Sequence, residues 1–135
     1  MRWCDESITL YNARYNAADD RDDYIRTVIN GVHWFCEVVS AVDASGLKAA
    51  NKYRIRIPIE ADTGGKKYVD PISFMEDATG KFTLKAGDII VRGVAAETNP
   101  RPKELQEKYA DCITILGITD STRAPNAPHW KVVGA

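Results

Sequence analysis

One nine-residue stretch, KYRIRIPIE at positions 52–60, limits the fold of this chain more than any other. Apolar and charged side chains alternate through it, and a period of two is the spacing of a β-strand with one face on a core. The expected inward set is Tyr53, Ile55, Ile57 and Ile59, and the expected outward set is Lys52, Arg54, Arg56 and Glu60. Pro58 lacks a backbone donor, which predicts that this strand is an edge strand or meets one. Arg54, Arg56 and Glu60 are therefore candidates for contact with a neighbouring subunit.

Further runs have strand-like composition at 8–10, 24–29, 32–39, 89–91, 112–119 and 129–134. Asn30-Gly31 falls between two of these runs, and we expect a hairpin there because the favoured two-residue turn needs positive φ at both positions. The segment 101–111 predicts one helix, with Pro102 in its first turn. The sequence thus predicts a single domain, 1–135, that is mainly β: a small β-barrel or sandwich with long loops and one short α-helix.

Composition argues against several classes of protein. The net charge is -1, with Lys and Arg spread throughout, so there is no basic stripe to neutralise several phosphates. No apolar run approaches the roughly 20 residues of a membrane span, and no signal peptide is evident, so we expect a cytoplasmic protein. The three cysteines are odd in number and widely spaced, which predicts free thiols, with Cys36 and Cys112 buried.

The usual signatures of catalytic and metal sites are weak. Gly64-Gly65-Lys66-Lys67 lacks the pattern of a phosphate loop, and the acidic run at 19–23 lacks the spacing of a calcium loop. His33 and Cys36 lie three apart in an expected strand, so their side chains face opposite sides. We expect no catalytic, metal or cofactor-binding residue and no enzymatic activity. The alternative from another class is a small ligand-binding or hydrolytic β-barrel that uses His33, Cys36 or His129.

The stretch TLKAGDIIVRGVAAE at 83–97 poses the choice between a binding loop and a turn. No phosphate-loop helix follows it, and no partner residues for chemistry accompany it. We interpret Lys85 to Asp88 as a tight turn that begins a buried strand at 89–91, with Gly93 permitting a bend at its end.

Four stretches carry a resemblance to a known family: ITLYN, YIRTVINGVHW, FTLKAGDIIVRG and ITILGITDSTRAPNAPHWKVVG. They resemble small proteins encoded among the structural genes of tailed bacteriophages that infect Gram-positive bacteria. The order of YRIRI, LKAGDIIVRG and ITILGIT is similar to the strand order of the head-tail joining, or stopper, proteins of siphophages. The similarity covers nearly the whole chain.

This resemblance implies a structural virion protein of the phage neck, present in the host cytoplasm during assembly. It would form a ring, commonly a hexamer, between the portal and adaptor proteins above and the tail tube or tail terminator below. The ring would help to retain packaged DNA, which passes without sequence-specific binding. A tail-terminator or tail-completion ring is the alternative within phage assembly. The resemblance implies no cofactor and no membrane partner.

Two long loops, at 41–51 and 61–67, should protrude from so small a barrel. Their polar residues are candidates for contact with the ring lumen or with a partner protein: Asp43, Ser45, Lys48, Asn51, Asp62, Lys66 and Lys67. A near-neutral net charge fits a lumen through which DNA slides, since a basic lumen would hold the phosphates.

Overall fold

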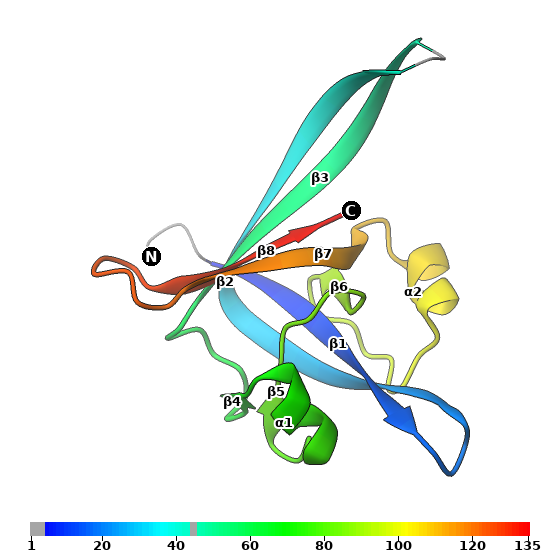
Figure 1. Ribbon diagram of the computed structural model, residues 1–135, viewed down its shortest axis with the longest axis vertical. Coiled ribbons are helices and arrows are strands. Elements are labelled where there is room, and N and C mark those ends of the chain that lie inside the picture. Colours follow the sequence, from blue (N-terminus) through cyan, green and yellow to red (C-terminus); the bar gives the residue numbers. More distant parts are fainter. Residues whose placement is uncertain (1–4, 44–45) are drawn as a thin grey trace.

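The computed structural model describes residues 5–43 and 46–135, with the backbone alone between 37 and 51. It is mainly β, which confirms the predicted fold class (Figure 1). The elements, in chain order, are β1 (Glu6–Asn16), β2 (Arg21–Asp43), β3 (Gly46–Pro58), β4 (Lys67–Tyr68), α1 (Pro71–Glu76), β5 (Lys81–Phe82), β6 (Ile89–Arg92), α2 (Pro102–Lys108), β7 (Cys112–Ser121) and β8 (His129–Gly134).

Six of the strands are joined by antiparallel pairing in the order β1-β2-β3-β8-β7-β6. The short strand β6 pairs with β7 on one side and with β1 on the other, so the order returns to its first strand and forms a closed barrel. Strands β4 and β5 form a separate parallel pair beside α1. Closing the sheet in this way leaves the strands of the barrel body paired on both sides.

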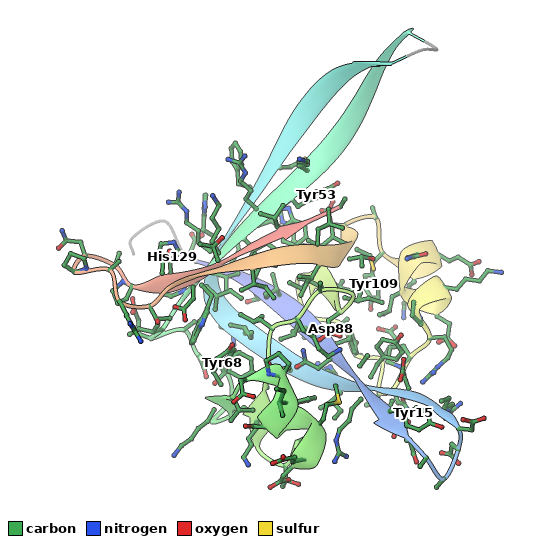
Figure 2. All side chains as sticks on the ribbon, in the orientation of Figure 1. Tyr15, Tyr53, Tyr68, Asp88, Tyr109 and His129 are labelled. Atoms are coloured by element: carbon green, nitrogen blue, oxygen red, sulfur yellow. The ribbon has the colours of Figure 1, made fainter. Side chains whose placement is uncertain are left out.

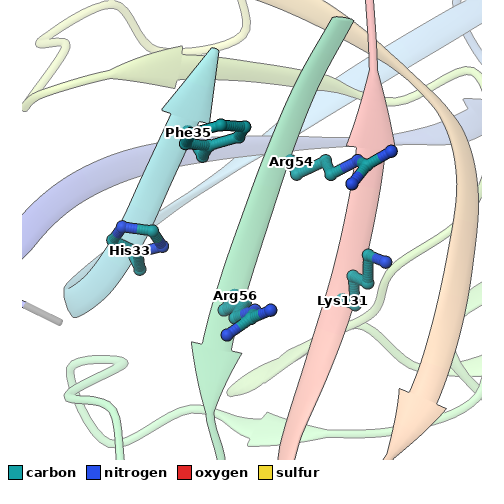
Figure 3. Close-up of a pocket in the computed structure, with 5 residues that line it drawn as sticks. All are labelled: His33, Phe35, Arg54, Arg56 and Lys131. Carbon is teal, nitrogen blue, oxygen red and sulfur yellow. The ribbon is translucent and has the colours of Figure 1, made fainter. Parts of the chain in front are cut away.

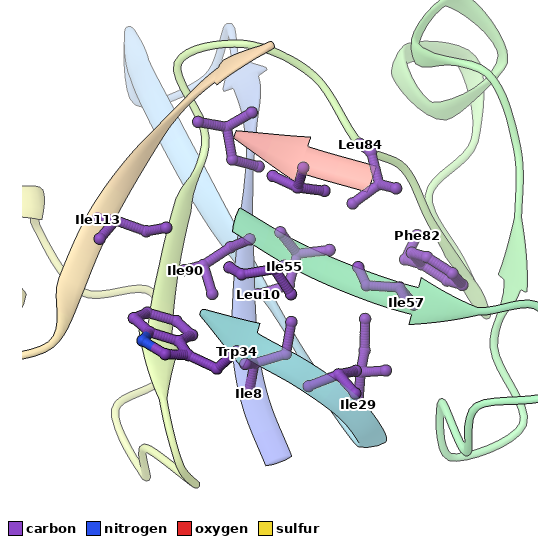
Figure 4. Close-up of a cluster of buried hydrophobic side chains, with 13 residues drawn as sticks. Ile8, Leu10, Ile29, Trp34, Ile55, Ile57, Phe82, Leu84, Ile90 and Ile113 are labelled. Carbon is purple, nitrogen blue, oxygen red and sulfur yellow. The ribbon is translucent and has the colours of Figure 1, made fainter. Parts of the chain in front are cut away.

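The barrel is filled by apolar side chains that point inward from all six strands (Figure 4). Its buried members are Ile8, Leu10, Ile29, Val32, Trp34, Ile55, Ile57, Phe82, Leu84, Ile90, Ile113, Ile115 and Val132. A second, smaller cluster joins α2 to the outside of the barrel and consists of Tyr11, Ile89, Val91, Ala95 and Leu105. Burying an isoleucine or leucine of this kind contributes about 1.5–3 kcal/mol relative to leaving it in water.

The hairpin expected at Asn30-Gly31 is wrong, because β2 runs straight through both residues. Gly31 has a φ of 85° and is the extra residue of a β-bulge, since Glu6 pairs with Val32 while Ser7 pairs with Asn30. A bulge uses the same positive φ that a turn would need. The hairpin turn lies instead at 17–20, where the acidic loop joins β1 to β2. Just after the bulge, β2 changes its partner strand. Its pairing with β1 ends at Val32, and its pairing with β3 begins at His33.

Strand β3 confirms the alternation of 52–60 in its centre, where Ile55 and Ile57 are buried and Arg54 and Arg56 are exposed. Ile59, which was expected inside, is 49% exposed because β3 has already ended. The edge position is also wrong, since β3 pairs with β2 and with β8 along this stretch. Pro58 is tolerated because it is the last residue of the strand rather than part of an edge.

The structure has two helices in its described residues, where one was expected. α2 begins and ends inside the predicted segment 101–111. α1 was not predicted from the sequence. Asp70 caps this helix by accepting a hydrogen bond from the Ser73 backbone N–H at 2.9 Å, and Pro71 lies in its first turn. Neither of these described helices is long and apolar enough to cross a membrane.

Beyond the barrel, β2 and β3 continue as a two-stranded ribbon, which we call the arm and define as residues 37–43 and 46–52. Strand β3 pairs with β8 only as far as Tyr53, whose partner on β2 is Cys36. Seven further pairs between β2 and β3, from Glu37–Lys52 to Asp43–Gly46, lie in the arm. Figure 1 shows the arm rising from the barrel. The segment 41–51, expected as a loop, is therefore strand wherever it is described, because pairing with β2 outweighs its weak local pattern.

Candidate functional site

A basic hollow lies on the outer face of the barrel, at the root of the arm. It has a volume of about 200 Å³ and is lined by His33, Phe35, Arg54, Arg56 and Lys131 (Figure 3). His33 and Phe35 come from β2, the two arginines from β3 and the lysine from β8. Outward positions of three neighbouring strands thus meet in one place, as the two-residue period of a strand requires.

The pairing of the strands fixes which of these side chains are neighbours. Arg56 pairs with His33 on one side and with Lys131 on the other. Phe35 pairs with Arg54 and is 47% exposed, so an aromatic ring stands beside the cations. Like charges directly opposite on adjacent strands destabilise a sheet, and a bound anion would remove that cost. The chemistry of the hollow is that of a receptor for carboxylates or phosphates.

A second hollow, of about 210 Å³, lies at the end of the barrel beside β4. Tyr68, Phe82 and Trp130 form its aromatic wall, with the Tyr68 and Trp130 ring centroids 4.8 Å apart. Lys66 also lines it, but its Nζ donates to the Arg26 carbonyl at 2.6 Å and to Thr27 Oγ1 at 2.9 Å. Burial, with a smaller effect of Arg26, lowers the pKa of Lys66. Lys66 therefore fastens its loop to β2.

Asp88, at the end of the TLKAGD turn, is a buried carboxylate with a full set of partners. Its Oδ1 accepts from Lys85 Nζ at 2.6 Å and from the Ala13 backbone N–H at 3.1 Å, and its Oδ2 accepts from Asn12 Nδ2 at 2.7 Å. Burial raises the pKa of Asp88, and these donors oppose the rise. The turn itself is confirmed, with φ of 92° at Gly87 and 89° at Gly93. Asp88 joins β1 to the start of β6 and has a structural role.

An acidic tip, which we define as residues 15–23, closes the β1–β2 hairpin at the end of the molecule away from the arm (Figure 2). Asp19, Asp20 and Asp22 are exposed there, and Tyr15 is 58% exposed. The Tyr15 hydroxyl donates to Asp20, and this bond raises the pKa of the phenol. Four aspartates against Arg21 give the tip a negative charge beside an exposed aromatic ring.

The residues expected at partner-contact loops fall into three groups. Asp43, Lys48 and Asn51 lie in the arm, where only their backbone is described, and Ser45 lies outside the described residues. Asp62 accepts a hydrogen bond from the Gly64 backbone N–H at 2.9 Å, and Lys67 is exposed.

Of the three expected edge residues, Arg54 and Arg56 line the basic hollow, whereas Glu60 is exposed in the turn after β3.

The residues of the alternative catalytic hypothesis lie on two strands, His33 and Cys36 on β2 and His129 on β8. His33 lies in the basic hollow, Cys36 is exposed at the root of the arm, and the Nδ1 atom of His129 lies 2.9 Å from the Ala127 carbonyl oxygen. Cys112 is half-buried, so the expectation that both cysteines are buried is wrong; Cys36 lies where β2 leaves the core. Among the described side chains, those of residues 5–36 and 52–135, no three from His, Cys, Asp or Glu could hold a metal ion.

Sequence reasoning missed the basic hollow. The outward alternation of Arg54 and Arg56 was visible, but it gave no sign that Lys131, some 75 residues further on, would lie beside them. Only the antiparallel register of β3 with β8 brings the three cations together.

Fold and site together define a small β-barrel that carries a protruding hairpin arm and a basic hollow at its root. The chain belongs to a family of unknown function, DUF6751, whose model matches residues 3–135. No curated protein and no solved structure matches the chain.

Proposed function

We propose that this protein is a structural subunit of the neck of a tailed phage. It forms a homo-oligomeric ring that completes the head, joins the portal and adaptor to the tail, and helps to retain packaged DNA. The sequence resemblance supports the phage assignment, and the arm is the structural observation that carries the proposal of a ring.

The arm has the form of a segment built to contact another chain. Its two strands pair with each other and, among the described residues, with no third strand, so each keeps an unpaired edge. A two-stranded ribbon is at best marginally stable alone in water, and free edges readily accept another strand. A neighbouring subunit would stabilise the arm by covering it.

The length of the arm favours a second copy of the chain as that neighbour. Seven residues of extended strand reach about 23 Å beyond the barrel. A compact domain of this size has a radius of gyration of about 14 Å, so the arm extends onto an adjacent body of similar size. Copies arranged around a closed ring give every arm the same neighbour.

The overall charge is compatible with the passage of DNA. A ring that DNA must slide through cannot hold many phosphates at once, and the net charge of -1 avoids strong attraction. The basic hollow is a local patch of three cations within this near-neutral surface.

Shortening the arm tests the proposal. Replacing residues 39–50 by two glycines removes no side chain of either buried cluster, so the barrel should still fold. In a phage that lacks the gene, wild-type protein should restore infectious particles, and the arm-shortened protein should leave heads and tails unjoined. A variant with a shortened β7–β8 loop at 122–127 is the matched control. Full rescue by the arm-shortened protein would contradict the proposal.

The same micrographs separate the two positions in the neck. Filled heads without tails that carry the protein indicate a head-completion ring. Headless tails that carry it indicate a tail terminator. Antibody labelling of each fraction distinguishes them, and absence of the protein from both would exclude a virion role.

A further inference from the structure

We propose that the basic hollow of one subunit binds the acidic tip of the next copy of the chain, which makes the ring a head-to-tail assembly. The contact deepens the proposed ring function and rests on it. The occupant of the hollow is a carboxylate-bearing hairpin of the same protein.

Charge complementarity carries the first step. Arg56 and Lys131 lie on paired positions of adjacent strands, and neither has an ion-pair partner within the described residues. Two cations at paired positions of adjacent strands are unfavourable in the isolated subunit. The tip presents Asp19, Asp20 and Asp22 exposed to solvent, which is the opposite charge in a projecting shape.

Matching apolar surface carries the second step. Phe35 is 47% exposed in the hollow, and Tyr15 is 58% exposed at the tip. Large exposed aromatic side chains beside charged groups are typical of residues that become buried in an interface. A docked tip would cover both rings and bring its carboxylates to the cations.

The positions of the two surfaces carry the third step. β2 runs from the acidic tip at Arg21 to the hollow at His33 and Phe35, and the tip lies at the end of the molecule away from the arm (Figures 1 and 2). One subunit therefore presents the two surfaces in different places. A contact between two different surfaces is heterologous, and such contacts close into rings when the rotation between copies allows it.

Charge reversal tests the contact. The hollow-reversed protein carries Arg56→Glu and Lys131→Glu, and the tip-reversed protein carries Asp19→Lys and Asp22→Lys. Each alone places like charges together and should weaken self-association by at least about tenfold. Mixed together, every hollow again meets an oppositely charged tip, so association should return. The mixture can close only rings with an even number of subunits, which the mass of the product would show.

Controls with equal charge changes elsewhere keep this result specific. Lys103→Glu with Arg123→Glu matches the hollow variant, and Glu76→Lys with Glu107→Lys matches the tip variant, all four positions being exposed. Circular dichroism verifies that each variant folds.

A disulfide trap detects the contact even if the purified protein associates weakly. In a background with Cys4→Ser and Cys36→Ser, a Lys131→Cys protein is mixed with an Asp20→Cys protein under mild oxidation. We expect cross-linked dimers several-fold above those formed when Lys103→Cys replaces Lys131→Cys. No excess of dimers over that control, or unchanged association of both charge-reversed proteins, would overturn the proposal.

Duplex DNA provides the competing outcome. Three results together would show that the hollow binds phosphate: wild-type protein binds a labelled duplex, the hollow-reversed protein does not, and the disulfide trap yields no excess dimers. That combination would overturn the proposal. The neck role fails separately, by absence of the protein from particles, whether or not the trap captures dimers.

Discussion

Arg56 on β3 and Lys131 on β8 are paired residues of adjacent strands, so two cations face the same solvent from the outer wall of the barrel. The electrostatic repulsion between these two cations should lower the stability of the isolated subunit by a measurable amount. Lys131→Gln should raise the free energy of unfolding by about 0.2–1 kcal/mol at low salt. The gain should shrink as added salt screens the charges.

Urea unfolding at low and high ionic strength measures this difference. Lys103→Gln is the control, because Lys103 lies on α2 with the Glu107 carboxylate 3.9 Å from its Nζ. A loss of stability in Lys131→Gln at low salt would show that the two cations do not repel each other.

The buried carboxylate of Asp88 should be essential to the fold. Asp88→Ala removes the acceptor of the Ala13 backbone N–H and of Lys85 Nζ, and it leaves Asn12 Nδ2 with only its bond to the Thr83 carbonyl oxygen. Breaking a buried pair in this way costs about 3–5 kcal/mol. Urea unfolding should show that loss, while Glu107→Ala on the surface of α2 should change stability by less than about 0.5 kcal/mol. Equal effects of the two substitutions would refute the structural role of Asp88.

Gly134 and Gly117 form a matched pair of glycines. A Cβ at Gly134 would lie 2.7 Å from Ile113 Cδ1 and 2.8 Å from the Thr114 carbonyl oxygen, whereas a Cβ at Gly117 meets nothing within 4 Å. Gly134→Ala should therefore destabilise the barrel by about 1–3 kcal/mol, the usual cost of overpacking. Gly117→Ala should have a much smaller effect. Thermal melts of both variants test this, and a reversed order would contradict the close packing of β8 against β7.

Glu97 should contribute to stability in a pH-dependent way. Its carboxylate accepts from Lys108 Nζ and from the Tyr109 hydroxyl, and these bonds, with that from Lys108 foremost, lower its pKa from 4.5 to about 2. Because the folded pKa lies below the unfolded one, the contribution is present above about 4.5 and is lost as pH falls towards about 2. The stability of wild type and Glu97→Gln should differ at neutral pH and converge in acid. A constant difference across this range would exclude the mechanism.

Local sequence patterns predicted the parts of the fold that local geometry determines. The alternation of Ile55 and Ile57 gave the inward face of β3, and Gly87 and Gly93 marked the turn before β6 and the bend after it. The strands expected at 112–119 and 129–134 are also present in the structure, where they are β7 and β8. In each case the preference of a residue for a backbone conformation, or the period of its neighbours, determines the result without reference to distant segments.

The remaining features depend on which strands meet, which local pattern does not specify. The Asn30-Gly31 pair serves a bulge equally well as a turn, and only the pairing with Glu6 and Ser7 decides between them. The arm depends in the same way on the register of β2 with β3, and the basic hollow on the position of Lys131 beside Arg56. Long-range pairing of this kind fixes sites that no single stretch of sequence contains.

The proposed place of the protein in the phage neck is the central claim, and labelling of virions tests it most directly. Purified virions would be treated with gold-labelled antibody against the full-length protein and viewed by negative-stain electron microscopy. The account predicts label at the junction of head and tail, with quantitative mass spectrometry giving about six copies per particle, the stoichiometry expected for a ring of this kind. Particles that carry no label at the junction and contain no copies of the protein would contradict it.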